Sequence, residues 1–221
     1  MIKILLCCEG NLDKGGEIYT DNEYINADGV IQILISKLSI GHALGFVVKN
    51  RQDIRKKELL GPKHSTHSTV ARKLAQLAKD ENCRYIIYHQ DEDNKGLENI
   101  YRKVHSYFSA AAEKGISCLA IVPQHMTESW LLSDANAYEQ VFGKEPMNPA
   151  LPSKPEEIWG NNHPKKFMAQ VLSQYNDTIS PEIYAEIAEK SKTNVMRIRC
   201  PESFDKKFYA DMQSFIAKDS Q

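Results

Sequence analysis

The segment Tyr85-Ile86-Ile87-Tyr88-His89-Gln90-Asp91-Glu92-Asp93-Asn94 joins an apolar run to three consecutive acids. Its first part is rich in β-branched and aromatic residues, which predicts a buried strand from Cys83 to Tyr88. The acids would then lie at the C-terminal end of that strand, and ligands bind at this edge of open α/β sheets. Three adjacent carboxylates disfavour one another's ionised forms. A hard cation such as Mg²⁺ relieves this repulsion, because oxygen atoms are its preferred ligands.

The N-terminal segment repeats the pattern. A continuous apolar run from Ile2 to Cys8, typical of a strand buried on both faces, is followed directly by Glu9. In a parallel sheet both strand ends lie at one edge, and neighbouring strands are about 5 Å apart. Strand alternation would place Asp91 and Asp93 on one side and Glu92 on the other. We therefore predict that Glu9, Asp91 and Asp93 share a divalent cation.

Further strands and helices alternate along the first 125 residues. Strands are predicted at 44–48 and 116–122, and the helical spacing of apolar residues predicts helices at 30–39, 68–79 and 96–114. The polar segment 9–28 contains two adjacent glycines and is interpreted as a loop. The resulting β-α-β-α-β-α-β order is typical of an α/β fold with a mostly parallel sheet flanked by helices on both faces.

The remaining residues, 126–221, are organised differently. Helices are predicted at 127–142, 165–175, 181–190 and 200–217, with a segment rich in Pro, Asn and Gly at 143–164. We expect a helical C-terminal extension that packs as a cap on the α/β core of residues 1–125 and is not an independent domain.

Composition narrows the classes of function. The net charge of the 221 residues is −1, so no overall field attracts nucleic acid. The N-terminal apolar run is too short for a signal peptide, and no run approaches the roughly 20 apolar residues of a membrane span. Five cysteines without a Cys-x-x-Cys pair are typical of reduced, buried thiols. We therefore expect a cytoplasmic protein that makes no membrane contact. The sequence also has no P-loop, no dinucleotide fingerprint and no Gly-x-Ser-x-Gly elbow.

Two basic segments are candidates for contacts with nucleic acid. One follows the predicted second strand and the other precedes a helix of the extension. Their basic residues are Arg51, Arg55, Lys56, Lys57 and Lys63 in the first segment and Lys165 and Lys166 in the second. A basic loop at the edge that carries the acids would bind backbone phosphates in a salt-dependent way. A solvated charged surface is the alternative interpretation.

A further acid follows the predicted fourth strand. In the segment Glu128-Ser129-Trp130-Leu131-Leu132-Ser133-Asp134, Glu128 lies at a helix start, where the helix dipole favours a negative charge. It would also lie at the same sheet edge as Glu9 and Asp91. A role as metal ligand and a role as helix cap are both open for Glu128.

Together these segments resemble a known family. The pair Glu9-Gly10 after the first strand and Asp91-Glu92-Asp93 after a later strand resemble the Toprim domain. This domain occurs in topoisomerases, bacterial primases, recombination-mediator proteins and nucleases of the overcoming-lysogenization-defect type. The segment 128–134 resembles the Glu-x-Trp-Leu-Leu-x-Asp segment of small bacterial proteins with a Toprim-like core. Segments 161–166 and 197–204 resemble C-terminal segments of the same proteins.

The resemblance implies a nuclease or a related phosphoryl-transfer subunit that acts on nucleic acid with Mg²⁺ or Mn²⁺. In that case Glu9 would be the general acid and base, and Asp91 and Asp93 would be metal ligands. Glu128 would be a supporting acid or a ligand of a second metal. Such metals bridge the phosphate, activate water and stabilise the leaving oxygen. Some relatives are encoded beside ATPases and are thought to serve in phage defence, so a separate ATPase is an implied partner.

A non-catalytic alternative stays open, because a fold does not by itself determine a function. The protein would then keep the Toprim-like fold and bind nucleic acid or an ATPase without cleavage. Binding of Mg²⁺ or Mn²⁺ that depends on Asp91 would favour the enzyme over this alternative.

Overall fold

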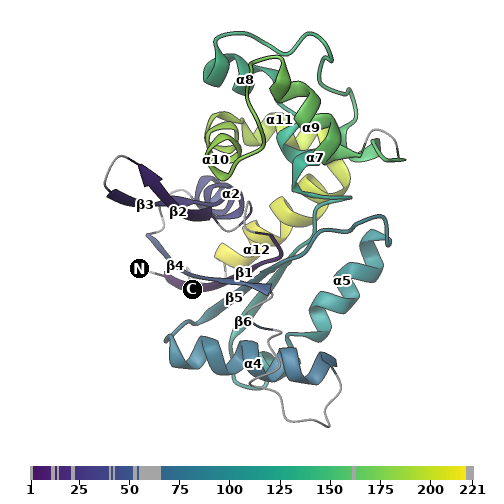
Figure 1. The fold of residues 1–221 in the computed structure, drawn as a ribbon. Coiled ribbons are helices and arrows are strands. Elements are labelled where there is room, and N and C mark those ends of the chain that lie inside the picture. The colour runs from purple at the N-terminus through teal and green to yellow at the C-terminus, as the bar shows by residue number, and fades with distance from the viewer. Residues whose placement is uncertain are drawn as a thin grey trace.

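A four-stranded parallel sheet lies at the centre of the computed structural model (Figure 1). Its strands, in spatial order, are β4 (Leu44–Asn50), β1 (Ile2–Cys8), β5 (Tyr85–His89) and β6 (Ser117–Ile121). Each pair of neighbours is parallel. The structure describes residues 2–10, 13, 15–20, 23–39, 41, 43–51, 54, 66–160 and 163–217. The predicted α/β class with a parallel sheet is confirmed, and this arrangement is consistent with a Toprim-like fold.

Helices cover both faces of this sheet (Figure 1). The chain returns from one strand to the next through α2 (Val30–Leu38), α4 (Thr66–Asp80), α5 (Leu97–Ser106) and α6 (Ser109–Ala112). The predicted helix at 96–114 is thus two helices. Parallel strands need such crossover connections, which explains why strand and helix alternate along the chain.

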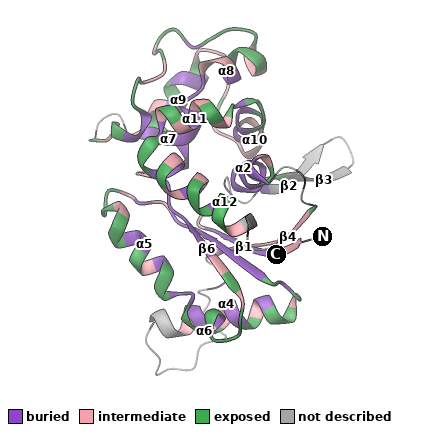
Figure 2. Cartoon of the chain, turned by 180° about the vertical axis from the view of Figure 1, so that it is seen from behind, coloured by how far each residue is buried: buried purple, intermediate pink, exposed green. Residues whose placement is uncertain are grey.

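Alternate residues of the strands fill two separate hydrophobic cores. Ile4 and Leu6 of β1 pack with α2 and with helices of the C-terminal part. Leu5 and Cys7 of the same strand point to the other face, where α4, α5 and α6 supply the partners. Figure 2 shows β1 and β5 largely buried between helices whose outer sides are exposed, whereas β4 at the sheet edge is mostly of intermediate exposure. Burial on both faces explains why β1 and β5 are continuous apolar runs.

The strand order determines where a ligand crevice lies. From β1 the chain passes to β4 on one side, and it then crosses back to β5 on the other side of β1. This reversal is a topological switch point, and in open α/β sheets ligands bind there, beyond the carboxyl ends of the strands. The residues that follow β1 and β5 therefore flank the candidate crevice.

The segment interpreted as a loop at 9–28 contains a hairpin, so that prediction is wrong. Strands β2 (Gly15–Thr20) and β3 (Glu23–Asp28) pair antiparallel as a second, two-stranded sheet. The sequence of the hairpin does carry a β signal, because Ile, Tyr and Thr recur in it. The two adjacent glycines at the start of β2 obscured this signal.

The C-terminal part is helical, as predicted, but the helix boundaries differ. Its elements are α7 (Thr127–Leu131), α8 (Ala135–Phe142), the short 3₁₀ helix η2 (Pro155–Glu157), α9 (Pro164–Ser173), α10 (Pro181–Lys190), α11 (Thr193–Arg199), the π-helical η4 (Pro201–Tyr209) and α12 (Ala210–Ala217). The predicted helix at 127–142 is interrupted because Asp134 caps α8, where its side chain accepts a hydrogen bond from the backbone N–H of Asn136 at 3.1 Å. Helix α11 was not predicted.

The C-terminal helices share the core of the first sheet face. The ring centroid of Trp130 in α7 lies 5.1 Å from the ring centroid of Phe204 and 5.3 Å from that of Phe208, both in η4. These three rings belong to the same buried cluster as Ile4 and Leu6 of β1. The Trp-Leu-Leu segment after Glu128 is thus core packing that ties α7 to the end of the chain.

Two further expectations can be compared with the structure. All five cysteines are free thiols, and four of them are buried, whereas Cys118 is partly exposed. In the part of the chain that the structure describes, no helix has both the length and the apolar character needed to cross a membrane.

Candidate acidic site at the carboxyl edge of the sheet

The structure brings Glu9 and Asp91 together at the switch point. The backbone N–H of Asp91, two residues after β5, donates a hydrogen bond to Oε2 of Glu9, directly after β1, at 2.9 Å. The other carboxylate oxygen of Glu9 forms an ion pair with Arg51, directly after β4. Residues that follow three neighbouring strands thus come together at this site.

Asp91 is held from the opposite side by α7. Its Oδ1 accepts hydrogen bonds from the backbone N–H of Thr127 at 3.1 Å and from the hydroxyl of Thr127 at 3.3 Å. Burial and the charge of Asp13 raise the pKa of Asp91, although His89 acts in the other direction. About one sixth of the side chain remains exposed, at 17%. Among the described residues, no hydrogen bond or ion pair reaches Oδ2 of Asp91, so this oxygen is available to a ligand.

His89, the last residue of β5, lies between Asp91 and a third acid, Asp13. Its Nε2 lies 3.0 Å from the hydroxyl of Thr127 and 3.5 Å from Oδ1 of Asp91. Its Nδ1 lies 3.8 Å from Oδ2 of Asp13 and has no hydrogen-bond partner in the described part of the chain. Burial by itself lowers the pKa of His89, but the charges of Asp13, Asp91 and Glu128 outweigh it and raise the pKa. The protonated form of this buried imidazole reduces the electrostatic repulsion between the neighbouring carboxylates.

Glu128, the second residue of α7, is the most deeply buried of these acids, with 5% of its surface exposed. Its Oε1 accepts a hydrogen bond from the hydroxyl of Tyr184 in α10 at 2.9 Å. Burial, together with the charges of Asp91 and Asp13, raises the pKa of Glu128 to about 7. Glu128 is therefore an acid that can hold or release a proton near neutral pH.

Asp93 lies close enough for its charge to act on Asp91, but its ion-pair partner is outside this group. Its side chain pairs with Lys95 at 2.8 Å and is 36% exposed. Strand alternation does not apply to it, because β5 ends at His89 and Asp93 adopts a positive φ of 51°. The expected common side for Asp91 and Asp93 assumed an extended backbone, and the turn that follows β5 removes that basis.

Glu92 organises the loop and does not face a ligand. It is 3% exposed and accepts hydrogen bonds from the backbone N–H groups of Asn94 at 3.0 Å and His125 at 3.1 Å, and from that of Gly96. Its Oε2 also lies 3.1 Å from Nδ1 of His125. The middle acid of the triplet thus ties the loop after β5 to the loop after β6.

A row of three aromatic rings lies beside this loop. The ring centroids of His125 and Trp159 are 4.8 Å apart, and those of Trp159 and His163 are also 4.8 Å apart. The charge of Asp93 acts on His163, which places the row near the acidic loop, although burial dominates and lowers the pKa of His163. Flat rings at such a place are suitable for stacking against an unpaired base.

The predicted basic residues fall into three groups. Arg51 is engaged by Glu9 inside the site. Lys165 and Lys166 are exposed in the first turn of α9, next to His163. Arg55, Lys56, Lys57 and Lys63 lie outside the described residues.

Sequence reasoning missed several members of the site. Asp13 lies in the segment interpreted as a loop, where nothing in the local sequence marks it as buried. Thr127 and Tyr184 come from α7 and α10, so only the fold brings them to Asp91 and Glu128. For His89, burial and a contact with the acids were both foreseeable from its place in the strand.

The oxygen donors of Asp91 and Glu9 suit a hydrated Mg²⁺ ion, which needs only one or two protein carboxylates besides substrate phosphates. Within the described residues, no group of three or more His, Cys, Asp or Glu side chains is arranged to hold a metal ion by itself. Comparison of the chain with models of protein families, with curated proteins and with solved structures finds no match.

Proposed function

We propose that this protein is a divalent-cation-dependent phosphodiesterase that acts on nucleic acid, with the acidic site as its active site. One observation carries the proposal: Glu9 and Asp91 are joined by a hydrogen bond of 2.9 Å at the topological switch point of a parallel sheet. Acids whose pKa is raised by burial and by one another cluster at functional sites, and Asp91 and Glu128 both show this.

Asp91 and Glu9 are the residues that would hold Mg²⁺ or Mn²⁺, with Asp93 at the rim of the site. The bound cation would neutralise charge on the phosphate and lower the pKa of a water molecule. Among the described residues no hydrogen bond reaches Oδ2 of Asp91, whereas Oδ1 accepts hydrogen bonds from Thr127. The bonds from Thr127 fix the orientation of the Asp91 carboxylate, which preorganises the ligand.

Arg51 is suited to bind the substrate. It forms an ion pair with Glu9 in this structure, and its guanidinium forms paired hydrogen bonds with phosphate as readily as with carboxylate. A phosphate group that binds Arg51 would displace Glu9 from its ion pair and would thus free one carboxylate oxygen of Glu9. Glu9 would then be free to accept a proton from the attacking water, as a general base does.

Glu128 can supply the second proton transfer. Its pKa of about 7 leaves it partly protonated at neutral pH, which suits a general acid. Tyr184 holds one of its oxygens, so the other is the one that would exchange the proton. Lys165, Lys166 and the aromatic row are residue types suited to contact the rest of a nucleic-acid chain. A separate ATPase partner is part of the same proposal.

The test is cleavage of end-labelled single- and double-stranded DNA and RNA with Mg²⁺ or Mn²⁺. We expect wild-type cleavage in at least one combination and loss of it in Asp91→Asn and Glu9→Gln. Glu186→Gln, an exposed acid on α10, is the control for the change in charge. Cleavage that survives in Asp91→Asn would refute the proposal, provided that its circular dichroism spectrum matches the wild type.

A second candidate is a binding protein without catalysis. The ion pair between Arg51 and Glu9 favours it, because an acid neutralised by an arginine is a poor cation ligand. Calorimetric titration with Mn²⁺ separates the two functions. Binding that is lost in Asp91→Asn supports the enzyme, and nucleic-acid binding without Mn²⁺ binding supports the second candidate.

A further inference from the structure

A basic pocket lies at the edge of the sheet opposite to the acidic site. It has a volume of about 640 Å³ and is formed by the end of α4 and the turns that precede β5 and β6. Its lining residues are Ala78, Lys79, Asn82, Cys83, Arg84, Lys114, Gly115 and Ile116. Pockets for small ligands have this size, and a few polar groups over an apolar lining are typical of them.

The charged residues that line this pocket are all basic. Three of its eight lining residues are Lys or Arg, and none is Asp or Glu. Among the described residues, no ion pair reaches Lys79, Arg84 or Lys114. Two acids next to Lys79 in the sequence have other partners: Glu81 pairs with Lys3 at 3.9 Å and with Lys49 at 3.7 Å, and Asp80 accepts a hydrogen bond from Gln76. Glu113 directly precedes Lys114 and does not line the pocket.

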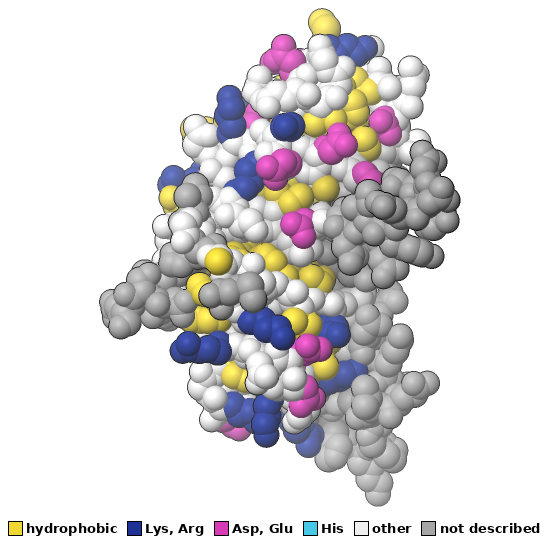
Figure 3. All heavy atoms as spheres, turned by 90° about the vertical axis from the view of Figure 1, so that its left-hand side faces the viewer, with side chains coloured by type: hydrophobic (Ala, Val, Ile, Leu, Met, Phe, Trp, Pro, Cys, Tyr) yellow, Lys and Arg dark blue, Asp and Glu magenta, His cyan; other side chains and the backbone are white. Residues whose placement is uncertain are grey.

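The surface around the pocket is also basic. Figure 3 views the face where the strands begin, and Lys and Arg side chains gather on its lower half, whereas Asp and Glu are more frequent on its upper half. The whole chain has a net charge of −1, so this distribution is local. A local positive field attracts anions and raises their concentration at the pocket.

The lysines are not needed to cap the helices. Lysines near a helix C-terminus often stabilise the free backbone carbonyls there. In this protein, backbone N–H groups already do so: Cys83 donates to the carbonyl of Ala78 at 2.7 Å, and Ile116 donates to that of Ala111 at 3.1 Å. The ammonium groups therefore remain available to a ligand.

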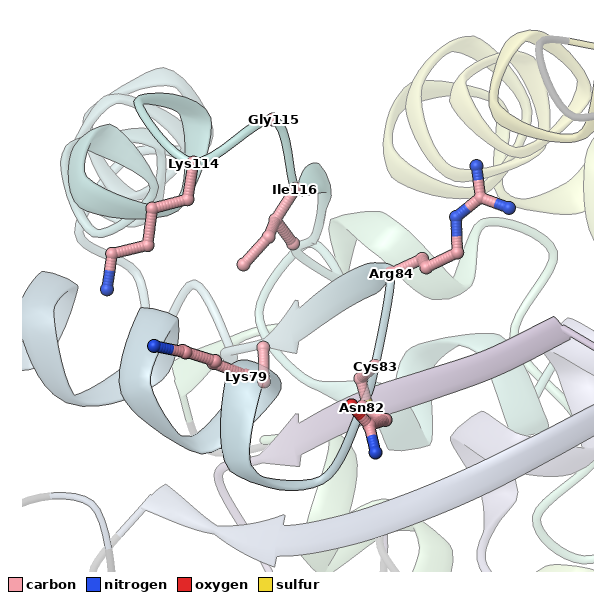
Figure 4. Close-up of a pocket in the computed structure, with 8 residues that line it drawn as sticks. Lys79, Asn82, Cys83, Arg84, Lys114, Gly115 and Ile116 are labelled. Carbon is pink, nitrogen blue, oxygen red and sulfur yellow. The ribbon is translucent and has the colours of Figure 1, made fainter.

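The side chains divide the pocket into two ends. In Figure 4, the ammonium groups of Lys79 in α4 and of Lys114 in the turn after α6 extend toward the same side. Arg84 lies on the other side, where its guanidinium points away from the two lysines, and Ile116 lies between the two ends in this view. A phosphate between the two lysines would leave the rest of the molecule over Ile116 and Cys83.

We propose that this pocket binds a small organic phosphate of the size of a nucleotide, with Lys79 and Lys114 on the phosphate and Arg84 at the far end. The amide of Asn82, with both donors and an acceptor, would meet polar groups of the organic part. Because the pocket and the acidic site lie at opposite ends of the same strands, the ligand is not the nucleic-acid substrate. Its role is that of an effector or of a second substrate.

Calorimetric titration with ADP in the presence of EDTA tests this proposal, because chelation keeps metal-bound ADP away from the acidic site. We expect ADP to bind the wild type and Lys79→Gln/Lys114→Gln to weaken its affinity by about tenfold or more, since two charge-assisted hydrogen bonds are lost. All three basic residues of the pocket are exposed, so these variants should fold. Adenosine should bind far more weakly than ADP.

Two controls make the outcome decisive. Lys190→Gln/Lys192→Gln removes the same charge from exposed positions at the end of α10, and Asp91→Asn alters the acidic site. Both should bind ADP as the wild type does. The proposal is overturned if the wild type does not bind ADP at about 5 mM, or if Lys79→Gln/Lys114→Gln binds as tightly as the wild type. Adenosine binding as tight as that of ADP, or loss of binding in either control, also overturns it.

Discussion

Replacement of Glu128 by Gln should change how the stability of the protein depends on pH. Glu128 is buried, and Tyr184 donates a hydrogen bond to it at 2.9 Å. Gln has nearly the same size and keeps an acceptor oxygen for Tyr184, but it does not titrate. The substitution thus removes the ionisation and retains the packing.

The sign of the effect follows from the pKa of Glu128. In the unfolded chain the carboxyl group loses its proton near its ordinary pKa of 4.5, whereas burial keeps the proton on the folded protein until about pH 7. Between these values the folded state binds more protons than the unfolded state. The free energy of unfolding therefore falls as the pH rises through this window, and it levels off above about pH 7.

The magnitude follows from the same shift. A rise of the pKa from 4.5 to about 7 corresponds to about 3 kcal/mol, at about 1.4 kcal/mol for each unit. This contribution is absent in Glu128→Gln. The difference in stability between the variant and the wild type should thus shift by about 3 kcal/mol in favour of the variant between about pH 4.5 and pH 7.

Urea unfolding followed by tryptophan fluorescence at pH 5, 6, 7 and 8 measures this difference. EDTA must be present, because a bound cation would stabilise the ionised carboxylate and mask the effect. Glu186→Gln, which removes an exposed acid, should change stability by the same small amount at every pH. Parallel curves for Glu128→Gln and the wild type would refute the reasoning, since they would show that Glu128 ionises equally in both states.

Three further predictions concern the site, the core and the aromatic row. Asp91→Asn should reduce cation-dependent cleavage far more than Asp93→Asn, because Asp93 pairs with Lys95 at the surface; equal losses in single-turnover rates would contradict this. Phe204→Ala should destabilise the protein by about 3–5 kcal/mol in urea unfolding, because its buried ring packs against Trp130, and a loss below about 1 kcal/mol would contradict that packing. Trp159→Ala should weaken binding of a single-stranded oligonucleotide by about 1–3 kcal/mol in fluorescence anisotropy, with binding of a duplex much less affected. Equal effects on both would show that Trp159 does not stack on bases.

The parallel sheet, and the position of Glu9 and Asp91 at the same sheet edge, were predictable because both follow from local patterns in the sequence. Continuous apolar runs mark the strands of a sheet covered on both faces, and they are visible in any window of the chain. Once the strands are parallel, their C-terminal ends must share one edge. Glu9 and Asp91, which follow neighbouring strands, were therefore expected at this edge, and there the backbone N–H of Asp91 donates a hydrogen bond to Glu9 at 2.9 Å.

The limits of this reasoning appear in the segments outside the sheet. Asp93 was placed by alternation, but alternation needs an extended backbone, and the chain turns at Asp93 and Asn94, both with positive φ. The hairpin at 15–28 was missed because adjacent glycines are compatible with both a loop and a strand start. Local propensity is weak at such positions, and tertiary contacts decide between the alternatives.

Only the tertiary structure assembled the rest of the site. Arg51 reaches Glu9, Thr127 reaches Asp91, and Tyr184 reaches Glu128 across separations of tens of residues in the chain. These contacts depend on how the loops and the C-terminal helices pack on the sheet, and no local pattern encodes that packing. The protonation of the acids depends on the same packing, because burial and neighbouring charges set it. The sequence alone thus determined which strands deliver the first two acids, and the packing of distant elements determined their partners and their charge.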